Sequence, residues 1–88
     1  MESKVIYVLV DQGLLSDDMY EYNTDVDVFE TFEKAWERLT YRYNEEVAYC
    51  VESGIEINRQ MISKEDGFAK IDADNCVSMF SIHKKELK

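Results

Sequence analysis

The apolar positions of the chain follow several patterns, and the first is a short continuous run. Lys4 to Asp11 reads KVIYVLVD, which is rich in β-branched residues and too short for an ordinary helix. Such a run is typical of a strand that is covered on both faces near the centre of a sheet. Gly13 and the polar residues around it then predict a loop over Gln12 to Asp18.

The segment from Tyr20 to Val28 alternates strictly between two kinds of side chain, which is the pattern of a half-buried strand. One face carries tyrosine, threonine and valine: Tyr20, Tyr22, Thr24, Val26 and Val28. The other face carries the amide and the acids: Glu21, Asn23, Asp25 and Asp27. We expect this strand to pair antiparallel with the first, with its valines inward and its carboxylates in an outward-facing row.

At Phe32 the period changes to three and four residues, which predicts a long amphipathic helix over 32–53. The apolar stripe of this helix comprises Phe32, Ala35, Trp36, Leu39, Tyr43, Val47, Cys50 and Val51. Thr31 is the expected N-cap, because its hydroxyl can accept a hydrogen bond from an amide of the first turn. Gly54 stands where a left-handed residue commonly ends a helix.

Two contacts of the helix follow from its sequence. Its stripe residues Trp36, Leu39 and Tyr43 should pack on the inward side of the alternating strand. The partners there would be Tyr22, Val26 and Val28. The sequence leaves two placements open for the tyrosines of that strand, in the core or against a partner. Arg42 can reach Glu46 one turn further on, an ion pair worth only a few tenths of a kcal/mol.

The last third of the chain is extended again. Three strands are predicted, at Ile55 to Ser63, Phe68 to Ala73 and Cys76 to Lys84. Asp66-Gly67 predicts a turn between the first two. The basic tail from His83 to Lys88 is expected to fray. The order β-β-α-β-β-β predicts a single α+β domain over 1–88. Its sheet would be antiparallel or mixed, with about four to five strands and the long helix packed on one face.

Composition agrees with one small folded domain. Of the 88 residues, 45% are hydrophobic and 12% are aromatic, which is enough for a single core. The first apolar run is far shorter than the about 20 residues of a membrane span, and it lacks the features of a signal peptide. We therefore expect a cytoplasmic protein of a bacterial or phage-infected cell. Cys50 and Cys76 are then expected to be free thiols.

The net charge of −9 comes almost entirely from one third of the chain. Between Lys4 and Lys34 there is no basic residue, and there are eight acidic ones: Asp11, Asp17, Asp18, Glu21, Asp25, Asp27, Glu30 and Glu33. The rest of the chain is close to neutral. Such a field repels nucleic acid and anionic membranes and attracts basic proteins, so direct binding to nucleic acid or membrane is not expected.

Candidate chemistry is sparse. Cys50, Cys76 and the single histidine, His83, are too few and too widely spaced for a zinc site. A calcium loop that begins at Asp72 would lack its required residues at three positions, which hold Cys76, Val77 and His83. Cys50 lies on the apolar stripe, where a thiol is usually inert. No carboxylate lies in an apolar segment that would raise its pKa. We therefore predict no catalytic, metal or cofactor site and a non-enzymatic protein.

The acidic face of the alternating strand has two interpretations. It is a solvated face that protects the strand from aggregation, or it is a binding surface that imitates the charge of nucleic acid. Carboxylates two residues apart on a strand are about 6.8 Å apart, whereas the phosphates of one DNA strand are about 3.4 Å apart along the axis. A mimic therefore needs neighbouring acids as well. The candidate partner-binding residues are Glu21, Asp25, Asp27, Asp17, Asp18 and Tyr20.

The segment 28–35, which reads VFETFEKA, leads from the alternating strand into the long helix, and Ser78 to Lys84 forms a closing strand. Together with the N-terminal hairpin, this arrangement resembles the small acidic orphan proteins of phages and mobile elements, some of which are anti-CRISPR inhibitors. The resemblance implies a protein that blocks a nuclease by occupying its nucleic-acid channel. It lies in the arrangement and in no motif, so it gives no single residue a role.

The leading hypothesis is a non-enzymatic inhibitor or adaptor that binds the basic surface of another protein, such as a nucleic-acid-binding protein. The alternative is a homo-oligomeric accessory protein whose exposed sheet edge or aromatic residues pair with a second copy. A third hypothesis, a metal-dependent enzyme, would need a carboxylate site that the sequence does not single out.

Overall fold

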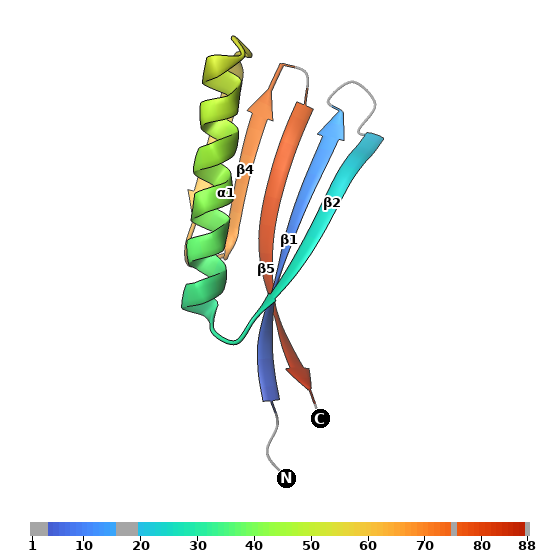
Figure 1. Cartoon of the computed structure of the whole chain (residues 1–88), viewed down its shortest axis with the longest axis vertical. Helices are drawn as coiled ribbons and strands as arrows, with labels where there is room; N and C mark the ends of the chain where they lie inside the picture. The colour runs from blue at the N-terminus through green and yellow to red at the C-terminus, as the bar shows by residue number, and fades with distance from the viewer. Residues whose placement is uncertain (1–3, 16–19, 75, 88) are drawn as a thin grey trace.

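A computed structural model describes residues 4–15, 20–74 and 76–87 of the chain. Its elements are β1 (Lys4–Leu15), β2 (Tyr20–Phe29), α1 (Phe32–Glu52), β3 (Ile57–Ser63), β4 (Phe68–Ala73) and β5 (Cys76–Leu87). The five strands form one antiparallel sheet in the order β2-β1-β5-β4-β3, and α1 packs on one face of it (Figure 1). The predicted α+β class and element order are confirmed, and the sheet is antiparallel throughout.

Both ends of α1 form as the sequence predicts. Thr31 is extended, with φ −131° and ψ 154°, and its hydroxyl oxygen accepts a hydrogen bond of 3.2 Å from the backbone N–H of Lys34. The helix ends at Glu52, and Gly54 follows with a φ of 72°, the left-handed conformation that glycine adopts without a steric penalty.

A second glycine fixes the turn between β3 and β4. Gly67 has a φ of 59°, and a Cβ atom placed on it would lie 3.3 Å from side-chain atoms of both Ile82 and Phe32. Its carbonyl accepts a hydrogen bond of 2.8 Å from the backbone N–H of Ile82. The β3–β4 turn therefore packs directly against β5 and the first turn of α1, and a side chain at this position would separate them.

The core lies between α1 and the central strands. It comprises Leu9, Leu39, Tyr43, Ala69, Ile71 and Phe80. The rings of Tyr43 and Phe80 meet edge to face at 6.3 Å between centroids, a favourable geometry for aromatic pairs. The hydroxyl of Tyr43 donates a hydrogen bond of 2.9 Å to the side-chain carbonyl of Gln60, so the polar end of this buried ring is satisfied.

Two strands run further than the sequence predicts. β1 continues through Gln12 to Leu15, where a loop was expected, because this stretch pairs with β2 on one side and β5 on the other. β5 continues through His83 to Leu87, where a frayed tail was expected, because Leu87 pairs with Lys4. Ladder hydrogen bonds on both sides of β1 outweigh the local preference of these polar and charged residues. The N-terminal end of β1 and the C-terminal end of β5 extend together beyond α1 (Figure 1).

The two faces of β2 are the reverse of those predicted. Asp25 lies opposite Asp11, and Asp27 lies opposite the core residue Leu9, so these carboxylates share the side of the sheet that faces α1. Val26 and Val28 lie on the other side and are 57% and 59% exposed. The predicted packing of these valines against the apolar stripe of α1 is therefore wrong. Alternation predicts a strand but does not say which of its faces is inward.

The same geometry corrects the prediction for β1. This strand is paired on both edges, as expected for an inner strand. Its side chains are covered along the face that carries Leu9, which is 1% exposed, whereas the opposite face is buried only at Leu14, which is 8% exposed. On the opposite face Val8 and Val10 remain partly exposed, and no described helix or strand lies over them. The continuous apolar run of β1 thus serves a buried face and an open one.

Candidate functional site

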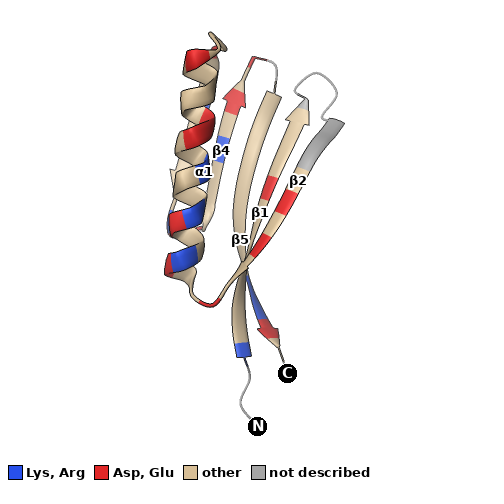
Figure 2. Cartoon of the chain, in the orientation of Figure 1, with Lys and Arg blue, Asp and Glu red and all other residues tan. Residues whose placement is uncertain are grey.

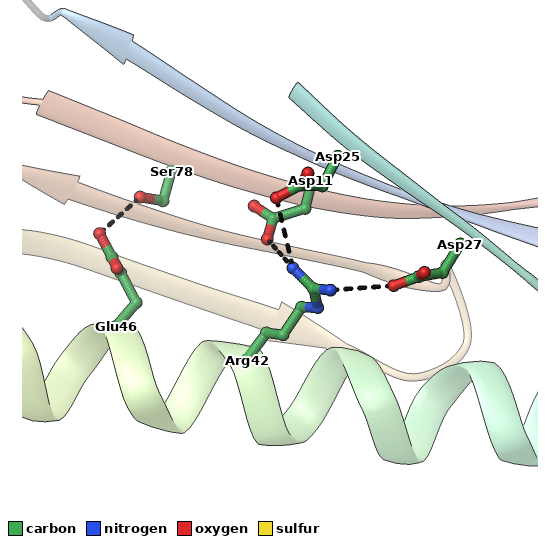
Figure 3. A network of polar contacts seen from close by, with 6 residues as sticks. All are labelled: Asp11, Asp25, Asp27, Arg42, Glu46 and Ser78. Carbon is green, nitrogen blue, oxygen red and sulfur yellow. Dashed lines mark hydrogen bonds and ion pairs between the residues drawn. The ribbon is translucent and has the colours of Figure 1, made fainter. Parts of the chain in front are cut away.

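A cluster of charged side chains joins α1 to the β1–β2 hairpin (Figure 3). One terminal nitrogen of Arg42, Nη1, lies 3.0 Å from Oδ2 of Asp11 and 3.7 Å from Oδ2 of Asp25. The other, Nη2, lies 2.9 Å from Oδ2 of Asp27. The predicted ion pair between Arg42 and Glu46 along the helix is therefore wrong. Arg42 pairs instead with the carboxylates of the sheet, which lie within reach of its planar guanidinium.

The backbone arrangement explains why these groups meet. Antiparallel pairing places Asp11 directly opposite Asp25, and Asp27 lies two residues further along the same face of β2. On α1, Arg42 lies between Leu39 and Tyr43 in sequence, both of which are buried against the sheet. Arg42 therefore points toward the sheet as well, and three carboxylates surround one guanidinium.

The cluster is only partly buried, and its charges are unbalanced. The side chains of Arg42 and Asp11 are 23% and 18% exposed, whereas those of Asp25 and Asp27 are 57% and 41% exposed. Nε of Arg42 is buried and has no hydrogen-bond partner among the described residues. One positive charge thus faces three negative ones, and most of the uncompensated charge lies at the solvent-exposed side of the cluster.

Burial has the largest effect on the pKa of Asp11, the least exposed carboxylate of the cluster. Loss of hydration raises the pKa of Asp11 above its ordinary value, although the hydrogen bond and the charge of Arg42 act in the opposite direction. The prediction that no carboxylate has a pKa raised by its surroundings is therefore wrong for Asp11. The neighbouring charges of Asp25 and Glu46 raise the pKa further. Burial disfavours the charged form of Arg42, but the hydrogen bond and charge of Asp11 outweigh it and raise the pKa of the guanidinium. Arg42 therefore stays positively charged.

An open groove of about 360 Å³ begins beside this cluster and runs between α1 and the sheet. It is lined by Asp11, Gly13, Arg42, Glu45, Glu46, Tyr49, Ser78 and Phe80. Glu46 accepts a hydrogen bond of 3.1 Å from the hydroxyl of Ser78, which fixes its carboxylate over β5 (Figure 3). Glu45 is exposed, and Tyr49 is 58% exposed. The groove thus combines several carboxylates with an accessible aromatic ring.

The candidate residues from the sequence fall into three groups. Asp25 and Asp27 lie at the Arg42 cluster, on the helix side of the sheet and not on an outward row. Tyr20 and Glu21 belong to β2, but their side chains lie outside the described part of the structure. Asp17 and Asp18 lie outside the described residues altogether.

The sequence reasoning missed the contribution of α1 to this site. Glu45, Glu46 and Tyr49 come from the helix, and Arg42 has its partners on strands far away in sequence. One signal was available, because Arg42 follows Leu39 by three residues and therefore lies on the apolar stripe of the helix. A charged residue on such a stripe indicates an oppositely charged partner on the surface that the helix covers.

The charged side chains of the groove are mainly carboxylates. Among the described residues, no group of three or more His, Cys, Asp or Glu side chains is arranged to hold a metal ion. Both cysteines are free, as predicted, and Cys50 is buried. Burial raises the pKa of its thiol, which keeps the sulfur protonated and unreactive. The carboxylates instead offer hydrogen-bond acceptors for guanidinium or ammonium groups.

The chain is thus a small α+β domain with an acidic groove between its helix and its sheet. No protein-family model matches it, and neither a curated protein nor a solved structure does. No helix in the described part of the chain is both long and apolar enough to cross a membrane.

Proposed function

We propose that this protein is a non-enzymatic binding module that holds a basic surface of another protein in the groove between α1 and strands β1 and β5, beside the Arg42 cluster. The observation that supports this most directly is the charge of the groove. Its lining and the adjoining cluster contain five carboxylates and a single arginine: Asp11, Asp25, Asp27, Glu45, Glu46 and Arg42.

Two of these carboxylates are best placed to receive a ligand. Asp25 is 57% exposed and lies 3.7 Å from Arg42, so its oxygens are less engaged than those of Asp11 and Asp27. Glu45 is exposed at the wall of the groove. An arginine of the partner that enters here would gain charge-assisted hydrogen bonds, and Tyr49 would offer an aromatic surface for stacking of its guanidinium.

The partner that this proposal favours is a nucleic-acid-binding protein, and the proposed effect is inhibition. Acidic positions lie on the C-terminal half of α1 and on the adjacent parts of β1 and β2, whereas the N-terminal half of α1 carries both signs (Figure 2). The negative charge therefore extends from the groove along one part of the helix. A surface of this sign is attracted to the basic channels that hold phosphate backbones and is repelled by nucleic acid. A protein that occupies such a channel excludes the nucleic acid from it.

The test compares three forms of the immobilised protein in a lysate of the source organism. They are the native chain, the groove variant Asp25→Asn/Glu45→Gln, and the control variant Glu56→Gln/Glu65→Gln. Both variants lose two charges at exposed positions, but the control residues lie outside the groove lining. Asp11 and Asp27 are left intact, because they hold α1 to the hairpin.

We expect the native and control forms to retain the same basic protein, and the groove variant and high salt to release it. With the purified partner, the groove variant should lower the association rate by about tenfold, because exposed charges act mainly on the encounter. The partner should also lose its nucleic acid when the native form binds. Equal retention by all three forms, or retention that salt does not affect, would rule out the groove as the binding surface.

A further inference from the structure

The face of the sheet that points away from α1 carries two apolar groups, one on β1 and β2 and one on β4 and β3, with the polar residues Ser81 and His83 of β5 between them. Register places Val10 beside Val26 on one side and Ser81 on the other, and Ser81 beside Phe68. All of these lie opposite to the core face, which carries Leu9 and Phe80. We call this surface the open face, and its accessible apolar side chains are Val8, Val10, Val26, Val28, Met61, Phe68 and Met79. Leu14 and Val77, at one end of the same face, are only 8% and 5% exposed.

No described element covers the open face. The only described helix, α1, packs on the opposite side of the sheet (Figure 1). Val26 and Val28 are more than half exposed, at 57% and 59%, and Met61 on β3 is 49% exposed. Single exposed apolar residues are ordinary, but two apolar groups on one face mark an interface. Ser81 and His83, which are joined by a hydrogen bond of 2.9 Å, lie between these groups on β5.

We infer that the open face binds the open face of a second copy of this chain, so that two sheets stack into a symmetric dimer with both helices outside. Charge favours a copy of the chain as the occupant. The clustered carboxylates Asp11, Asp25 and Asp27 lie on the helix side, so two copies can meet without bringing these acids together. The charged residues of the open face include both signs, as in Lys70 and Asp72 on β4.

The size of the face agrees with a dimer. Five strands about 4.8 Å apart, over about six residues of 3.3 Å each, give a projected area on the order of 500 Å² per copy. Because side chains protrude from the sheet, the solvent-accessible area of the face is larger than this projected area. Two copies therefore approach the range that begins at about 1,200 Å² for a specific interface.

Shape indicates how the copies are arranged. The β1–β2 half of the open face is low and built from valines, whereas the β4–β3 half carries the longer side chains Phe68 and Met61. A two-fold axis parallel to β5, the central strand, sets the valine half of each copy against the longer side chains of the other. Sheets in such sandwiches stack about 10 Å apart with their strands roughly aligned.

The test is the mass of the protein in solution from micromolar to millimolar concentration. We expect the native chain to approach twice its monomer mass of 10.4 kDa as the concentration rises. The variant Val26→Lys/Val28→Lys should raise the dissociation constant by roughly a hundredfold, because two apolar side chains at the interface become charged. The control Ala48→Lys/Val51→Lys adds the same charge at exposed positions of α1 and should dimerise like the native chain.

A second measurement does not depend on how well the lysine variant folds. Ser81 lies on β5, next to the proposed axis, so Ser81→Cys should be joined to its copy by a short bis-maleimide linker. The control variant Glu37→Cys places its thiol on the exposed side of α1 and should remain monomeric with the same reagent. Both variants also carry Cys76→Ser, so that the partly exposed native thiol does not react. A native chain that stays monomeric at all concentrations overturns the inference. So does a dimer that Val26→Lys/Val28→Lys leaves unchanged. Neither result bears on the acidic groove, which lies on the other side of the sheet.

Discussion

Helix α1 is attached to the two halves of the sheet by different kinds of contact. Over β4 and β5 the contact is apolar, and it is made by Leu39, Tyr43, Ala69, Ile71 and Phe80. Over β1 and β2 the contact also includes ion pairs, in which Arg42 binds Asp11 and Asp27 at 3.0 and 2.9 Å. The core residues of the first contact are buried, whereas the second contact adjoins the acidic groove, which also borders Ser78 and Phe80 of β5.

The two contacts are expected to contribute differently, one to stability and the other to binding. Apolar packing gains free energy in proportion to the area removed from water and leaves no charge available to a partner. An ion-pair contact gains little net free energy, because each group must first lose its hydration, but it fixes the groups in one geometry. On the β1–β2 side it also leaves Asp25 and Glu45 exposed beside an open groove. We therefore expect the β4–β5 side to determine stability and the β1–β2 side to determine binding.

The largest effect should come from truncating the apolar contact. Leu39 is 0% exposed, and Leu39→Ala should lower the free energy of unfolding by about 2–5 kcal/mol, through lost burial and the cavity that remains. Urea denaturation followed by circular dichroism measures this. Val51 is 69% exposed on the same helix, and Val51→Ala should change the free energy by less than about 0.5 kcal/mol. Similar losses in the two variants would show that α1 does not form the core through Leu39.

A smaller effect should come from the ion-pair contact. Arg42→Gln removes the donor from Asp11 and Asp27 and leaves three carboxylates close together, so we expect a loss of about 1–3 kcal/mol. Arg38→Gln removes the same charge from an exposed site of α1 and should cost less than about 0.5 kcal/mol. Hydrogen exchange should accelerate mainly in β2, an edge strand of the sheet. Uniform acceleration over all strands would contradict a local role for Arg42.

The sequence was sufficient to predict most of the fold, because local signals determine most of it. The period change at Phe32, the cap at Thr31 and the glycines at 54 and 67 correspond to the observed helix and turns. The ends of β1 and β5 were underestimated, since their residues have weak strand preference on their own. They are strands because the end of each strand pairs with the start of the other, Leu15 with Cys76 and Leu87 with Lys4.

The site was less predictable, because it depends on which face of β2 meets the helix. Asp25 and Asp27 were correctly picked out as unusual but were assigned to the outer face. Strict alternation of valine and aspartate is compatible with either orientation, and burial of valine is the usual outcome. Arg42 reverses that outcome, since it supplies a counter-charge for three carboxylates on the helix side.

The smallest effect should appear in the pH dependence of stability. Burial raises the pKa of Asp11 in the folded chain, so between its unfolded value of about 3.9 and the higher folded value the folded state binds more protons. This carboxyl group therefore stabilises the fold most when it is protonated, and its contribution falls as the pH rises through that window.

The variant Asp11→Asn lacks this titration and retains the shape of the side chain. The native chain should gain stability relative to Asp11→Asn as the pH is lowered toward about 4, by less than about 1.4 kcal/mol per pH unit, the limit for one proton. Urea denaturation of both proteins over this range measures the difference.

In an Arg42→Gln background the pH window should extend to higher pH, because the guanidinium no longer opposes the effect of burial on the pKa of Asp11. A difference that is independent of pH in both backgrounds would mean that Asp11 is as well hydrated as an exposed carboxylate. Arg42 would then serve as a surface charge and not as the link between α1 and the hairpin.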